Sequence, residues 1–221
     1  MSWRRQRERG MTLIETTIVL VATAVLVAAL APVAAAALTD ARIAAATTYA
    51  TNLATAINNA VSDISFPEFK VDGDGKGGDD VVRMLVSDGD TPDQCNVSTT
   101  DGCGTPTTGF LPEKSWIRPV QPDSNGTTIF TFVDFFDRHL ILDMPGNHVA
   151  NAYVTSWRGA YINTPISADP WGNRYMFSAQ NMNLFPETSN VLSAGPDEAI
   201  DTTWDLATKN ANADDIVVFV R

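Results

Sequence analysis

The sequence contains one long apolar segment, residues 11–38, whose only charged side chain is Glu15. Its 28 residues exceed the roughly 20 that an α-helix needs to cross a bilayer. Four arginines precede the segment within residues 1–10. The positive-inside rule therefore predicts a cytoplasmic N-terminus, a single membrane-spanning helix, and a globular region on the far side of the membrane.

The helical pattern continues beyond the apolar segment. Apolar residues recur in steps of three and four from Ile43 to Ile64, as the buried face of a helix does. We expect a single helix over residues 11–65, membrane-spanning over 11–38 and amphipathic over 39–65. Such a helix has one end in the bilayer and the other packed on a soluble domain.

An ordinary cleaved signal peptide is the alternative, because the alanine-rich end of the apolar segment resembles a signal-peptidase site. The chain would then be a secreted, soluble binding domain. The apolar segment, however, is longer than the about 7 to 15 residues of a signal peptide's apolar core. Glu15 would cost about 2.5 to 3.5 kcal/mol at a bilayer centre. A cleaved signal also needs no helical continuation.

The charge of the chain is strongly asymmetric. Removing the four Arg and one Glu of residues 1–10 from the 15 basic and 26 acidic residues leaves 11 and 25, a formal charge of −14. An acidic surface of this kind repels phosphate backbones, so we expect no nucleic-acid partner. Cations are the more natural small ligands.

Two pairs of residues invite a chemical interpretation. Cys95 and Cys103 are the only cysteines, too few for a structural zinc site, and export to an oxidising compartment favours a disulfide between them. His139 and His148 lie in no recognised catalytic motif. We therefore expect that the protein is not an enzyme.

Four short segments have the apolar or alternating pattern of strands: residues 81–86, 127–133, 139–144 and 214–220. The sequence VDGDGKGGDD, residues 71–80, predicts a loop. An EF-hand starting at Asp72 would require an acid where Arg83 stands. A solvated turn and a different calcium loop both remain open for this segment.

Residues 10–15, GMTLIE, follow a basic leader and open the apolar helix. This arrangement resembles the prepilin-peptidase signal of type IV pilins and type II secretion pseudopilins. The resemblance implies cleavage after Gly10, methylation of the new N-terminus at Met11, and retention of the helix in the mature protein. It also implies that Glu15 is the acid at the fifth mature position, and that Pro32 is the helix-kinking proline of these families.

The position of Glu15 also has a physical explanation. When apolar helices stack in a filament core, the new amino terminus is a buried cation that needs an anion. Glu15 of the same or a neighbouring subunit can supply it, which removes a cost of about several kcal/mol per unpaired buried ion. We expect Glu15 to act in assembly and Pro32 to bend the helix.

Residues 157–179, WRGAYINTPISADPWGNRYMFSA, resemble the W-x-G-P-Y-L and D-P-W-G-N-P-Y signature of the major pseudopilins of type II secretion. Ala160 and Arg174 stand where the signature has Pro. Residues 190–201, NVLSAGPDEAID, resemble the next strand and its S-x-G-x-D-G loop, with Glu198 in place of Gly. The resemblance implies a hairpin that packs on the long helix.

The resemblance also implies a calcium site, held between this loop and the acids before the last strand. The corresponding positions are Asp197, Asp214 and Asp215, and the carbonyl of Leu192 is a further candidate ligand. Calcium takes about six to eight oxygen ligands in a flexible geometry. A solvated turn is the competing interpretation of Asp214 and Asp215.

We therefore predict an α+β, pilin-like fold in which a long N-terminal transmembrane helix packs on a small antiparallel β-sheet. The expected parts are a leader (1–10), the long helix (11–65) and an outer globular domain (66–221), which has an enlarged loop region (66–155) and a C-terminal sheet (156–221).

The expected function is polymerisation through the N-terminal helix into a type II secretion pseudopilus or a related type IV filament. The expected partners are copies of the chain, other pilin-like subunits, a prepilin peptidase and an inner-membrane assembly platform. The expected location is the inner membrane, crossed once, with the C-terminal domain outside the cytoplasm.

Overall fold

The computed structural model describes residues 12–64, 69–71, 80–90, 92, 120–122, 128–130, 132–143, 156–179, 182, 189–202 and 214–220. The chain divides into two compact units, Met1–Ala41 and Arg42–Arg221.

The first element, α1, is a helix of 52 residues, Leu13–Ile64. Every described side chain of residues 12–41 is exposed. By length and composition, α1 is able to cross a membrane. Pro32 lies inside α1 and does not end it. The predicted long apolar helix is confirmed.

The second unit contains a six-stranded sheet with the order β1-β2-β6-β7-β8, and β5 pairs with β2. Its strands are β1 (Lys70–Val71), β2 (Asp80–Val86), β5 (Phe132–Phe135), β6 (Met176–Phe177), β7 (Asn190–Ser193) and β8 (Ile216–Phe219). Separate elements are the pair β3 (Val120–Pro122) and β4 (Thr128–Phe130), and the short helix α2 (Phe136–Leu140).

The large sheet is mixed, because β2 pairs with β5 in parallel and with β1 and β6 antiparallel. Leu85 of β2 lies opposite Asp134 of β5 and Phe177 of β6. A parallel pair requires a long connection, which residues 87–131 supply. The α+β pilin-like fold is confirmed, and the expectation of a wholly antiparallel sheet is corrected.

Side chains alternate between the two faces of the sheet. One face joins the core formed with α1 through Leu85, Phe177 and Val191. Their neighbours along the strands belong to a second apolar cluster, Met84, Met176 and Leu192, together with Ile200. The sheet is therefore buried on both faces, and the loop that carries Ile200 lies on the face away from α1.

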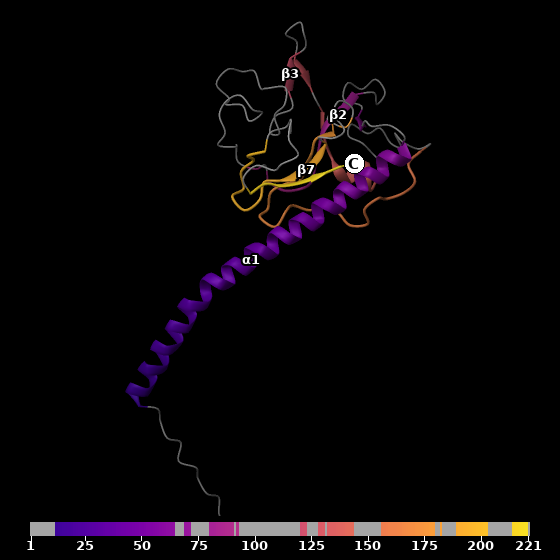
Figure 1. The fold of residues 1–221 in the computed structure, drawn as a ribbon. Helices are drawn as coiled ribbons and strands as arrows, with labels where there is room; N and C mark the ends of the chain where they lie inside the picture. The colour runs from indigo at the N-terminus through magenta and orange to yellow at the C-terminus, as the bar shows by residue number, and fades with distance from the viewer. Residues whose placement is uncertain are drawn as a thin grey trace, which may run out of the picture. The chain divides into compact units, whose positions relative to one another are not determined.

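Within the second unit, α1 buries one regular face. Its buried residues are Ala46, Ala50, Leu53, Ala54, Ala56, Ile57, Ala60 and Ile64. Figure 1 shows this part of α1 running along the sheet that contains β7. The spacing predicted from the sequence for this face is confirmed.

The strand predictions had mixed outcomes. Residues 81–86 lie in β2, as expected, and β8 covers residues 216–219 of the strand predicted over 214–220. Residues 127–133 contribute to two strands, β4 and β5, rather than one. The prediction of a strand over 139–144 is wrong, because His139 and Leu140 belong to α2 and a turn follows them. Tertiary contacts hold this helix: the Asp137 carboxylate accepts a hydrogen bond from the backbone N of Ile166 at 3.0 Å.

Candidate functional site

The acid of the apolar segment, Glu15, lies in the first turn of α1. Its Oε2 is 3.4 Å from the backbone N of Thr12, and its own backbone N is 3.4 Å from Oγ1 of Thr12. These reciprocal contacts have the pattern of a capping box, and the negative charge complements the helix dipole. Gly10 and Met11 lie outside the described residues, so the cleavage site stays a prediction.

The DPWGN turn, residues 169–173, is built around the buried side chain of Asp169. Asp169 Oδ1 accepts hydrogen bonds from the backbone N of Trp171 at 3.0 Å and of Asn173 at 2.9 Å. Gly172 has a φ of 101°, which glycine adopts without the steric cost of a Cβ. The turn predicted at this position is confirmed.

The predicted hairpin around this turn is correct in one arm only. After the turn, β6 pairs with β7 in an antiparallel arrangement. Before it, residues 156–168 form no strand, although all of them are described. They pack on α1 as irregular chain: Trp157 and Tyr161 join the core, and the Tyr161 hydroxyl lies 3.2 Å from the Asp63 carboxylate.

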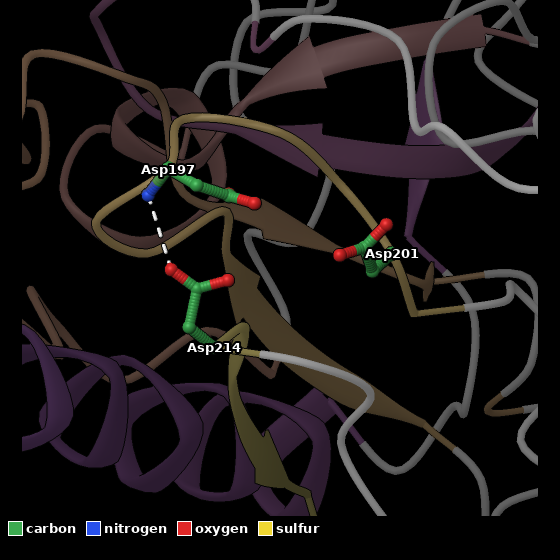
Figure 2. Close-up of side chains that lie close together, drawn as sticks. All are labelled: Asp197, Asp201 and Asp214. Atoms are coloured by element: carbon green, nitrogen blue, oxygen red, sulfur yellow. Dashed lines mark hydrogen bonds between the residues drawn. The ribbon is translucent and has the colours of Figure 1, made fainter.

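Three carboxylates meet between the loop after β7 and the start of β8, from Asp197, Asp201 and Asp214 (Figure 2). One oxygen of each lies within 4.8 Å of the others. The backbone N of Asp197 donates to Asp214 Oδ2 at 3.0 Å, which joins the two segments directly. We call these three residues the acidic cluster. Hard, oxygen-only ligands of this kind match the preference of calcium.

The pKa values of two acids in this region are raised. Burial raises the pKa of Asp201, and the charges of Asp197 and Asp214 raise it further. Burial also raises the pKa of Asp215 to about 6. Both raised pKa values mean that the ionised carboxylates are disfavoured. A bound cation would stabilise the ionised forms and lower both pKa values.

The Asp215 side chain lies directly against the loop that carries the acidic cluster. Its Oδ2 accepts a hydrogen bond from the backbone N of Asp201 at 2.9 Å and another from that of Thr202. Its Oδ1 is buried and has no hydrogen-bond partner among the described residues. An oxygen in this state is a candidate ligand for a cation.

The structure brings together two of the predicted calcium ligands, Asp197 and Asp214, and places Asp215 beside them. Leu192 belongs to β7, with its side chain in the apolar cluster on the face away from α1, and its carbonyl as a ligand stays a prediction. Asp201 was missed. Its signal was the spacing in PDEAID, where Asp197 and Asp201 flank the buried Ile200.

Glu198 is the residue of this loop that departs from the family motif. Glu198 has a φ of 62°, a left-handed conformation that favours glycine, and it stands where the motif has Gly. The backbone of this chain thus adopts the conformation that a glycine would serve.

His139, which lies in no catalytic motif, is part of the core. It is fully buried, and its Nε2 lies 3.0 Å from Asp134 Oδ2. Arg138 donates to the other oxygen of Asp134 at 3.0 Å, and the Trp157 indole donates to the His139 carbonyl. These contacts fasten α2 to its surroundings.

Three other predicted residues, His148, Cys95 and Cys103, lie outside the described residues. The disulfide between the two cysteines stays a prediction.

Comparison with known proteins gives one family. The family model described as "Type II secretion system (T2SS), protein G" matches residues 141–209. No curated protein and no solved structure matches the chain significantly. The matched range contains the DPWGN turn and two residues of the acidic cluster, Asp197 and Asp201. It does not include α1, which has the long apolar form expected of a pilin-like protein. Over residues 141–209 the chain is therefore similar to protein G of the type II secretion system, and this similarity supports a pseudopilin-like protein.

Proposed function

We propose that the chain is a pseudopilin subunit that polymerises through its N-terminal helix into a type II secretion pseudopilus or a related type IV filament. The observation that carries the proposal is the contrast along α1. Residues 16–38 carry no charge and expose a largely apolar surface, whereas the later part of the same helix contributes to the core of the second unit. Such a surface requires either lipid or other apolar helices around it. The family match over residues 141–209 favours the pseudopilin class.

The N-terminal residues have defined roles in this proposal. A prepilin peptidase cuts after Gly10, and the new amino group at Met11 is methylated. The Glu15 carboxylate already reaches back to the amide of Thr12, the residue next to Met11. Glu15 therefore lies within reach of the new amine in its own subunit, or it pairs with that of a neighbour, and the pairing favours one register between stacked helices.

The proposed subunit crosses the inner membrane once, with its C-terminal domain outside the cytoplasm. It is assembled by an inner-membrane platform, together with other pilin-like subunits, and it performs no catalysis itself. In the oxidising compartment Cys95 and Cys103 form a disulfide.

We further propose that the acidic cluster binds calcium, with Asp197, Asp201 and Asp214 as ligands and Asp215 beside them. Three carboxylates within 4.8 Å repel one another in the absence of a cation. Calcium binding to the folded state alone stabilises it by RT ln(1 + [L]/Kd). The cation links the start of β8 to the loop after β7.

N-terminal sequencing and mass spectrometry of the protein from membranes test the first proposal. An N-methylated Met11 is the expected start. A start beyond about residue 37, at the alanine-rich end of the apolar segment, would instead establish a cleaved signal peptide and a secreted binding domain. Gly10→Val is expected to accumulate as uncut precursor, since prepilin peptidase requires glycine at this position.

Thermal unfolding in calcium and in chelator tests the second proposal. The wild type is expected to melt higher in calcium, and Asp197→Asn with Asp214→Asn is expected to lose that difference. Asp40→Asn is the matched control, because Asp40 is an exposed acid of α1 outside the unit that contains the cluster. An equal shift in all three proteins would show that calcium acts elsewhere.

A further inference from the structure

A buried serine connects the loop after β7 to the DPWGN turn. This loop carries Asp197 and Asp201, and we call it the acidic loop. Ser193, at the end of β7, donates from Oγ to Asp169 Oδ2 at 2.7 Å. The same Oγ lies 3.4 Å from the backbone N of Gly195, which donates to it. Ser193 is fully buried and Asp169 is 5% exposed, so water does not compete for these contacts.

From Gly195 the contacts continue into the acidic cluster. Gly195 has a φ of 73°, and a Cβ added there would lie only 2.3 Å from the carbonyl oxygen of Asp214. The backbone of the loop therefore packs directly on Asp214, two residues before β8 begins. Asp214 in turn accepts the hydrogen bond from Asp197, so a displacement of Asp214 moves both the loop and the cluster.

On its other side, the DPWGN turn holds the segment Ser87–Asp90, which follows β2. The backbone N of Asp90 donates to the Gly172 carbonyl at 2.9 Å, and the backbone N of Arg174 donates to the Asp90 carbonyl at 3.0 Å. The Arg174 guanidinium adds a hydrogen bond to the Gly89 carbonyl at 2.9 Å. Proline has neither donor, so both Arg174 contacts are particular to chains with another residue at this position.

We propose that the DPWGN turn relays cation binding at the acidic cluster to the segment Ser87–Asp90, with Ser193 as the positioning residue between them. The proposal rests on the calcium site proposed above. Without the ion, repulsion among the three carboxylates favours loop openings that pull Asp214 from Gly195 and loosen the Ser193–Asp169 contact. With the ion, the loop closes and the turn holds Asp90 more firmly.

Two observations besides the acidic cluster support this coupling. The Oδ1 of Asp215 is buried and has no hydrogen-bond partner among the described residues, although the same side chain already binds the loop, so this oxygen remains available as a cation ligand. The contacts from Asp214 to Asp90 also form a continuous series, whose inner members Gly195, Ser193 and Asp169 are buried. Thermodynamic linkage requires the effect to be reciprocal, so loss of the Ser193 contact must weaken cation binding.

Ser178 provides a matched control for Ser193. Both serines are fully buried and both make two hydrogen bonds, but Ser178 contacts Asn190 at the opposite end of β7. Ser193→Ala and Ser178→Ala thus remove the same atom from comparable surroundings. Only the first breaks the connection between the turn and the acidic loop.

The experiment uses the full-length protein in detergent, with calcium chloride as the probe. Isothermal titration calorimetry measures the calcium affinity. Hydrogen exchange with mass spectrometry measures the exchange rate of backbone amides in peptides that contain residues 87–90 and 172–175. In the wild type and in Ser178→Ala, calcium is expected to slow exchange in both peptides. In Ser193→Ala, we expect affinity to fall by about fivefold or more and the slowing at residues 87–90 to disappear.

The possible outcomes distinguish the relay from the calcium site on which it rests. A wild type that binds no calcium overturns both. Calcium binding that slows exchange only around residues 195–202 leaves the calcium site intact and overturns the relay. Equal calcium affinities for Ser193→Ala and Ser178→Ala would remove Ser193 from the site.

Discussion

The ring of Tyr49 in α1 lies 5.2 Å from the ring of Tyr175, the residue before β6. The Tyr49 hydroxyl donates to the Pro165 carbonyl at 3.3 Å and accepts from the backbone N of Ser167 at 3.3 Å. One side chain of the helix thus holds both the irregular segment before the DPWGN turn and the strand after it. This contact fastens the sheet to the part of α1 that continues from the apolar segment.

Removing that hydroxyl tests its contribution to the fold. Tyr49→Phe is expected to lower the free energy of unfolding by about 1 kcal/mol, because two hydrogen bonds are lost and the ring stays. Tyr49→Ala is expected to cost about 2 kcal/mol or more, because the ring contact is lost as well. Urea unfolding measures both, with Thr48→Ala as an exposed control on the same helix. If Phe and Ala at position 49 had equal effects, the ring contact would contribute nothing.

Replacing Glu15 tests its role in assembly. Glu15→Ala is expected to leave cleavage after Gly10 intact and to abolish or greatly slow filament formation, because a buried amine would remain unpaired. Electron microscopy of material sheared from cells measures filaments, and the size of the protein reports cleavage. Asp40→Ala removes an exposed acid of α1 outside the apolar segment and is expected to assemble normally. Normal filaments from Glu15→Ala would refute the pairing.

The left-handed backbone at Glu198 predicts a stabilising substitution. Glu198→Gly is expected to raise the free energy of unfolding by about 0.5 to 1 kcal/mol, since relief of the positive-φ strain exceeds the entropic cost of glycine. Glu198→Gln distinguishes the effect of backbone strain from the effect of the charge, because it removes the charge and keeps the Cβ. Thermal unfolding in chelator compares the three proteins. A gain in the Gln variant as large as that in the Gly variant would assign the effect to charge.

The raised pKa of Asp215 predicts how pH changes the stability of the calcium-free protein. Its folded-state pKa is about 6, against an ordinary value of 3.8. The folded protein therefore binds this proton more tightly than the unfolded chain, and the resulting stability is present below pH 4 and lost as pH rises towards 6. The loss is at most about 3 kcal/mol, because each pKa unit corresponds to about 1.4 kcal/mol.

Asp215→Asn keeps an acceptor for the amides of Asp201 and Thr202 and removes the titration. In chelator it is expected to be more stable than the wild type at pH 7 and to lack the loss of stability between pH 4 and 6. In calcium the order is expected to reverse, because the variant offers a weaker ligand. Unfolding curves at a series of pH values measure this, and a wild-type slope retained in the variant would assign the titration to another group.

Much of this protein follows from local patterns in the sequence. The charge-free run over 11–38 and the apolar spacing from Ile43 to Ile64 predicted α1, because helix formation depends on residues within a few positions of each other. Short apolar runs predicted β2 and β8 in the same way. The DPWGN turn was also predictable, since Asp169 and Gly172 act through contacts inside the turn itself.

The tertiary structure decided what depends on distant residues. An apolar stretch at 139–144 satisfies a strand pattern, but His139 and Leu140 are helical because Asp134, Asp137 and the chain near Ile166 bind α2 there. The parallel pairing of β2 with β5 likewise has no local signal.

The acidic cluster shows the same division. Asp197 and Asp214 could be proposed as a pair from the family motif, yet Asp201 joins them only because β7 and β8 pair and Ile200 is buried beneath the loop. The connection from Ser193 to Asp169, between residues 24 positions apart, arises from the same packing. Sequence patterns determine which segments form helices and turns, and the burial of apolar side chains on both faces of one sheet decides which polar groups meet.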